Sequence, residues 1–149
     1  DAINKDFDQL SYSDERKVNG VRVILENVKK DAIKNNYLVG EFFKEKVVPT
    51  AQKLEEAINA IGSEKPSLTE QAQVLSLYKS FDKDSIDYQV KLENYVSKHK
   101  RNSDFKSLVE TNEKRIIMIK AFRENMREKV IALGVYLSND SNIDQAIAQ

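Results

Sequence analysis

The only histidine, His99, limits the chemistry that this chain can perform. A di-iron centre in a helical bundle needs Glu-x-x-His pairs on facing helices, but the residue three positions before His99 is Val96. The chain has no cysteine, which excludes disulfides, thiolate nucleophiles and Cys-ligated metals. A Ser–His–acid triad would have to be built around His99, close to a loop. We therefore expect no enzyme activity, no catalytic residue, no metal site and no cofactor.

Two clusters of charged residues invite a binding interpretation. Asp82, Asp84 and Asp87 resemble a calcium loop, but the glycine and the distal glutamate of such a loop are missing, so we interpret them as a solvated acidic helix face. The basic run at residues 98–101 could bind phosphate or nucleic acid. Cations also have a local electrostatic reason to lie at a helix C-terminus, and nucleic acid usually requires a broader basic surface. With 24 basic and 24 acidic residues the net charge is zero, so no nucleic-acid partner is expected.

Tyr78, Tyr88 and Tyr95 recur on one face of a predicted helix. They could line a ligand cavity, because each combines an apolar ring with a hydroxyl. Residues of this type more often lie in or at the edge of the core, with the hydroxyl reaching water, and we favour that interpretation.

Two asparagines occupy positions where an apolar residue would be routine. When the chain is folded back at its two predicted loops, Asn35, Tyr95 and Asn112 fall into one layer. This polar layer either binds a small polar ligand or sets the register of the helices. The same register brings Arg123 opposite Phe81, and we expect Arg123 to snorkel or to pair with an acid such as Asp82 or Asp84.

A long first helix is predicted over residues 13–61. Its apolar side chains recur at three- and four-residue steps from Val18 to Ile61, and Gly62 ends it. Pro49 lies inside this helix and predicts a kink near Lys46, because proline removes one hydrogen bond and crowds the preceding turn.

Two further helices are predicted over residues 68–100 and 104–138. Ser67 and Glu70 match a capping box at the start of the first of these. The apolar run 116–119 widens the buried face of the last helix and predicts contact with more than one neighbour, and Asn139 suits its end. Residues 1–12 and 139–149 are weakly patterned, with a short extra helix possible at either end. The helix over residues 68–100 is expected to bury one stripe of side chains: Val74, Tyr78, Phe81, Ser85, Tyr88, Leu92, Tyr95 and His99.

The predicted fold is all-α. Short loops join antiparallel neighbours, so the three helices form an elongated antiparallel three-helix bundle in up-down-up order, as one domain over residues 1–149. No apolar run approaches the ~18 residues that a membrane span requires.

The expected function is that of a non-enzymatic interaction or scaffold module with a protein partner, and a homodimer is one option. In general character the whole chain resembles the helical ectodomains of bacterial lipoproteins and membrane sensors, although no motif carries that resemblance. The first residue is Asp1, so we expect an upstream segment such as a lipid anchor and an extracytoplasmic location; a trimmed cytoplasmic protein is the alternative. The alternative function is a ligand-sensing ectodomain with a small polar cavity near Asn35, Tyr95 and Asn112.

Overall fold

The computed structural model describes residues 15–135, with side chains from residue 23 onward. These residues are helical with short connections, and none of them forms a strand, which confirms the all-α class. The elements are the α-helices α2 (Glu15–Phe42), α3 (Val48–Ile61), α4 (Leu68–His99) and α5 (Lys106–Ala132), the π-helical turn η2 (Phe43–Val47) and the 3-10 turn η3 (Ser103–Phe105). The segments 1–12 and 139–149, and any short helix in them, lie outside the described residues.

The chain divides into two units, Asp1–Tyr37 and Leu38–Gln149. The described part of the first unit is a single helix, the larger part of α2. The second unit contains the last residues of α2 and all the elements that follow it, so its core can be built from several helices.

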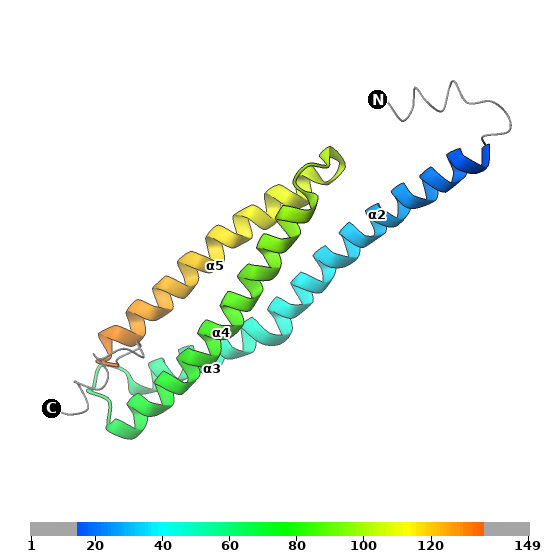
Figure 1. The fold of residues 1–149 in the computed structure, drawn as a ribbon. Coiled ribbons are helices and arrows are strands. Elements are labelled where there is room, and N and C mark those ends of the chain that lie inside the picture. The colour runs from blue at the N-terminus through cyan, green and yellow to red at the C-terminus, as the bar shows by residue number, and fades with distance from the viewer. Residues whose placement is uncertain (1–14, 136–149) are drawn as a thin grey trace, which may run out of the picture. The chain divides into compact units, whose positions relative to one another are not determined.

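Within the second unit, α4 packs against both α3 and α5. Figure 1 shows α4 and α5 lying side by side and running in opposite directions. Two ring contacts agree with this arrangement, because Phe81 of α4 meets Phe122 of α5, and His99 at the end of α4 meets Phe105 just before α5. The largest fully buried apolar side chains come from η2 and from all three helices: Val47, Leu54, Val74, Phe81, Leu92, Met126 and Val130.

Helix α4 has the start and the buried face that its sequence predicts. The Ser67 hydroxyl accepts a hydrogen bond from the Glu70 backbone N–H at 3.2 Å, and the Glu70 carboxylate accepts one from the Ser67 N–H at 2.9 Å. This reciprocal pair satisfies two donors that a helix start leaves without partners. The eight residues of the predicted stripe are all buried.

Pro49 lies directly after the π-helical turn η2. The Val48 N–H donates to the Phe43 carbonyl, the wider bond of a π-helix, and Pro49 then opens α3. The Thr50 hydroxyl donates to the Lys46 carbonyl at 2.9 Å. The helical path therefore continues through the proline, with one side chain supplying a donor where the backbone ladder is disturbed.

Helix α5 ends at Ala132, rather than at Ser138 as expected. Gly134 adopts φ +82°, and the Val135 N–H donates to the Val130 carbonyl while the Gly134 N–H donates to that of Ile131. These two bonds form a Schellman motif, which ends a helix and brings the following apolar residue back onto it. Val135 is accordingly buried in the same core cluster as Val130. The start of α5 also differs, because the helix begins at Lys106 rather than at residue 104, after a 3-10 turn that Asn102 caps.

No helix among residues 15–135 is long and apolar enough to cross a membrane.

Candidate functional site

A groove of about 500 Å³ opens on the second unit between the end of α2, the π-helical turn, α4 and α5. Its walls are mostly apolar: Phe43 comes from η2, Tyr88 from α4, and Met118, Ile119 and Phe122 from α5. The rings of Phe43 and Tyr88 lie 4.9 Å apart between their centroids. Two aromatic rings in contact make one wall of the groove rigid.

The polar groups that line the groove are cationic or neutral. The residues that carry them are Lys44, Arg115 and Tyr88, and no acidic residue is among the described residues that line it. Arg115 Nη1 donates to Asn112 Oδ1 at 2.9 Å, which orients the guanidinium. Burial raises the pKa of Tyr88, and the charge of Arg115 partly opposes this rise. The charge of Arg115 therefore acts on the Tyr88 phenol, and both residues line the groove.

Gly40 also lines the groove. A Cβ placed on Gly40 would meet no heavy atom within 4 Å, so packing does not require glycine here. Glycine inside a helix costs about 1 kcal/mol relative to alanine. The absence of a side chain at position 40 keeps this side of the groove open.

The expected polar layer of Asn35, Tyr95 and Asn112 is divided between the two units. Asn112 is fully buried on α5, and Tyr95 is buried on α4. Asn35 is half-buried on α2, in the first unit, so the layer stays a prediction. The groove of the second unit lies instead around Tyr88 and Arg115, the partner of Asn112.

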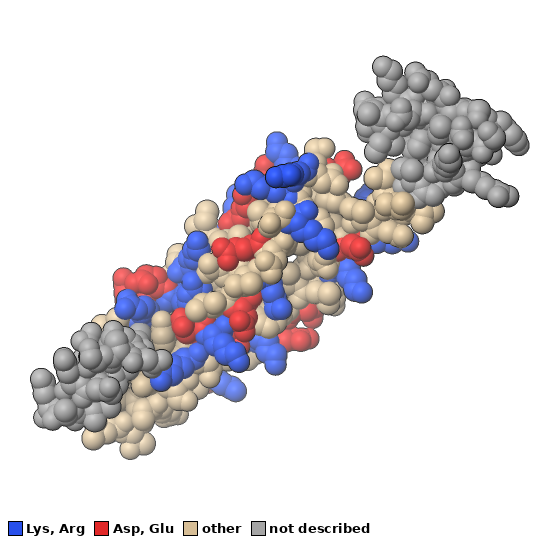
Figure 2. Space-filling view, viewed as in Figure 1, with Lys and Arg blue, Asp and Glu red and all other residues tan. Residues whose placement is uncertain are grey.

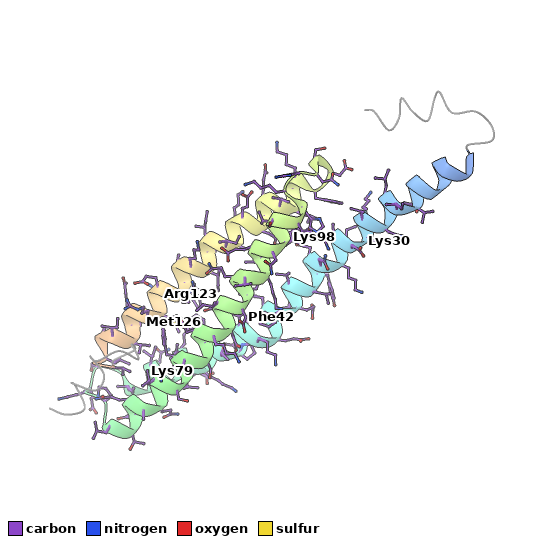
Figure 3. The ribbon with its side chains drawn as sticks, viewed as in Figure 1. Lys30, Phe42, Lys79, Lys98, Arg123 and Met126 are labelled. Carbon is purple, nitrogen blue, oxygen red and sulfur yellow. The ribbon has the colours of Figure 1, made fainter. Side chains whose placement is uncertain are left out.

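His99 is a core residue at the C-terminal end of α4. It is 3% exposed, and its ring lies 4.5 Å from that of Tyr95 and 5.3 Å from that of Phe105. Its neighbours in the basic run are exposed, including Lys98, which Figure 3 labels. The run therefore presents cations at a helix end, while the imidazole belongs to an aromatic cluster.

Arg123 joins α5 to the polar side of α4. Its Nη2 donates to Gln89 Oε1 at 2.7 Å, and its Nε lies 4.0 Å from Asp82 Oδ1, which confirms Asp82 as its acidic partner. Figure 3 shows Arg123 one turn from the buried Met126 on the same helix. The Tyr78 hydroxyl donates to the same Asp82 oxygen at 3.5 Å. Burial, reinforced by the charge of Asp82, raises the pKa of Tyr78 to about 12.

The three stripe tyrosines are core residues, as favoured from the sequence, and Tyr88 also lines the groove, in line with the cavity alternative. All three are buried, and burial raises the pKa of Tyr95 as well. The expectation that their hydroxyls reach water is wrong for Tyr95, whose hydroxyl oxygen is buried, and Tyr78 bonds to a carboxylate instead.

Charges of both signs are interspersed on the face of the molecule shown in Figure 2. Among residues 15–135, no group of three or more His, Cys, Asp or Glu side chains is arranged to hold a metal ion.

Sequence reasoning missed the groove, although one signal pointed toward it. The run 116–119 predicts contact with more than one neighbour, yet Ile117 and Met118 are 69% and 68% exposed. An apolar run wider than the helix can bury indicates a surface with an unassigned role. The contribution of Phe43 was hidden because the π-helical turn changes which residues share a face.

No known protein family, curated protein or solved structure matches this chain.

Proposed function

We propose that this chain is a non-enzymatic helical module that binds another protein through the apolar surface of α2. One observation carries the proposal: large apolar side chains of α2 in the first unit are exposed, with Ile24 at 61% and Tyr37 at 63%. The other exposed large apolar residues of α2 in this unit are Val23, Leu25, Val28 and Ile33. Exposed apolar area of this extent on one helix is typical of an interaction site.

The spacing of these residues favours a helical partner. Leu25, Val28, Ala32, Asn35 and Val39 alternate three- and four-residue steps, which is the seam of a coiled coil. On this seam Leu25 and Val28 are exposed, whereas Ala32 and Val39 are buried. Val23, Ile33 and Tyr37 lie on the other side of the helix. A helix that is apolar on two sides needs cover on both, so a bundle with partner helices suits α2 better than a single pair.

The proposed architecture is an elongated antiparallel three-helix bundle in up-down-up order. Support comes from the short connections, residues 62–67 and 100–102, between consecutive helices that pack together. We place a kink of the first helix at the π-helical turn before Pro49, where its hydrogen-bond ladder changes.

Photo-crosslinking in the cells that make the full chain tests the proposed interface. A photoreactive residue at position 24 should capture one partner, whereas the same residue at Lys79, an exposed polar position of α4 outside this surface, should not. The purified partner must then bind the chain, and Leu25→Glu with Val28→Glu should weaken that binding at least tenfold. Equal capture from both positions, or binding that the two glutamates leave intact, would refute the interface. Sedimentation of the pure chain shows whether the partner is a second copy.

We also propose an extracytoplasmic location for the module. The coding sequence upstream of Asp1 tests it. A signal segment ending in a lipid-acceptor cysteine would support an anchored lipoprotein, and flanking apolar spans of ~20 residues would support a membrane sensor. An initiating Met directly before Asp1 would place the chain in the cytoplasm.

The alternative function is a ligand-sensing ectodomain with a small polar cavity near Asn35, Tyr95 and Asn112. The full burial of Asn112, a polar side chain in an apolar core, favours it. A screen of small polar molecules should then raise the melting temperature, and Asn112→Leu should abolish that shift. No shift in the wild-type chain would count against a sensor.

A further inference from the structure

We propose that the groove of the second unit binds an amphiphile that combines an unbranched apolar chain with one carboxylate, the chemistry of a free fatty acid. This site is separate from the apolar surface of α2, and the proposal does not depend on the protein partner.

The apolar walls fit a flexible hydrocarbon chain. A volume of about 500 Å³ lies inside the range of roughly 300–1,000 Å³ that small-molecule sites occupy. The paired rings of Phe43 and Tyr88 supply a rigid surface, and the exposed Met118 supplies an adaptable one. Phe122 is held in place by packing, because its ring lies 5.6 Å from that of the fully buried Phe81. The groove is therefore a supported concave site whose walls do not depend on a bound protein.

The charge of the groove selects an anion. Arg115 carries five N–H donors in a planar fork, and its bond to Asn112 orients that fork. A carboxylate matches the fork and forms charge-assisted hydrogen bonds with it. Lys44 adds a second cation; it lies 3.9 Å from Glu41 in an exposed ion pair, which leaves it able to turn toward an anion. A neutral or cationic amphiphile would leave Arg115 without a matching charge.

Gly40 supplies an independent argument that the groove is kept open. Alanine would suit the helix better at this position and would meet nothing within 4 Å. A larger side chain would extend into the groove and occupy the space of a ligand.

Calorimetric titration of the full chain with three probes, each below its micelle-forming concentration, tests the proposal. The probes are dodecanoate, dodecanol and dodecyltrimethylammonium, which share a chain length and differ in charge. We expect one dodecanoate per chain, bound about tenfold more tightly than dodecanol, because a charge-assisted hydrogen bond adds about the energy of a tenfold change in affinity. The cationic probe should bind most weakly.

Two variants locate the site. Arg115→Gln should weaken dodecanoate about tenfold while leaving dodecanol unchanged. Lys120→Gln, which removes an exposed cation of α5 that does not line the groove, should change neither. Gly40→Phe should abolish the binding of both probes while circular dichroism shows an intact helical fold.

Three results would overturn the proposal. One is no binding of dodecanoate to the wild-type chain. Another is equal affinity for all three probes, or affinity that Arg115→Gln leaves unchanged. The third is a dimer of the wild-type chain that Gly40→Phe dissociates, because a second copy would then cover the groove.

Discussion

Helices α4 and α2 carry the same kind of pattern with different results. In both helices apolar residues recur at three- and four-residue steps. On α4 the whole stripe is buried, and Phe81 and Leu92 have no exposed area. On α2 the stripe is buried only in its later part: Leu25 and Val28 keep 45% and 40% of their surface exposed, whereas Ala32 and Val39 are buried.

This difference shows what periodicity can and cannot predict. A stripe shows that a helix has a face to bury, but neighbouring elements must supply the cover. Helix α4 has two neighbours in its own unit, α3 and α5. The described part of the first unit is one helix, and its large apolar side chains between Val23 and Tyr37 stay exposed. The proposed partner of α2 would supply what α3 and α5 supply to α4.

The largest predicted effect is on the free energy of unfolding, and it distinguishes the buried face of α4 from the exposed side chains of α2. Phe81→Ala should lower the free energy of unfolding by about 3–5 kcal/mol, because it removes a fully buried ring and leaves a cavity. Ile24→Ala, at an exposed position of α2, should change it by no more than about 0.5 kcal/mol. Urea unfolding of the isolated chain measures both. A loss at position 24 that approached the loss at position 81 would show that α2 is already covered in the isolated chain.

High pH should separate a buried tyrosine from an exposed one. The pKa of Tyr78 is raised from 10.0 to about 12, so the unfolded chain loses this proton first as the pH rises. The stabilisation is complete below pH 10 and is lost as the pH approaches 12, with a total on the order of 2 kcal/mol. Tyr78→Phe should flatten this part of the stability curve.

Tyr37→Phe is the matched control for that measurement, because its ring is 63% exposed on α2. It should leave the pH dependence between 10 and 12 unchanged. An equal flattening by both substitutions would mean that the loss of stability comes from the total charge of the chain and not from burial of Tyr78.

Much of the fold was predictable because its signals are local or strictly periodic. The capping box at Ser67 depends on two residues three apart, and Gly62 ends α3 with φ +65°. Asp82 was one of the acids expected near Arg123, because short loops fix the register of two adjacent helices, and it is the one that pairs.

Two features were not predicted, the end of α5 and the π-helical turn, because at each of them one local sequence signal competes with the helical periodicity. Apolar residues continue beyond Ala132, so the periodicity suggested a longer α5, but Gly134 and the burial of Val135 favour a Schellman turn instead. Pro49 predicts a disturbance, yet not the π-helical turn that places Phe43 against Tyr88. The groove follows from that turn, and a fixed helical period could not reveal it.

Gly40 tests whether the end of α2 gains stability from its helix or from its neighbours. Gly40→Ala should raise the free energy of unfolding by about 1 kcal/mol through helix propensity alone, because the new methyl group meets nothing. Gly134→Ala is the control of opposite sign and should lower it by about 1 kcal/mol, because φ +82° strains any residue with a Cβ. Thermal unfolding of both variants measures the two effects. A loss at position 40 would show that glycine is needed there by a close neighbour.

The smallest predicted effect concerns the two asparagines of the expected polar layer. Asn112→Leu should raise the free energy of unfolding by no more than about 1 kcal/mol, because it replaces a buried polar group by an apolar one of similar size and lets Arg115 turn to solvent. Asn35→Leu instead extends the apolar stripe of α2 and should promote self-association, which sedimentation detects.

The two substitutions together decide what the asparagines do. If Asn112 only sets the register, its loss leaves the monomer folded and at least as stable, and Asn35→Leu alone changes the oligomeric state. A loss of more than 1 kcal/mol in Asn112→Leu would contradict this, because the hydrogen bonds of Asn112 would then be part of what holds α5 in place. The effect is small in energy but diagnostic in kind. The fully buried Asn112 should respond through stability, and the half-buried Asn35, on a helix with exposed apolar side chains, should respond through self-association.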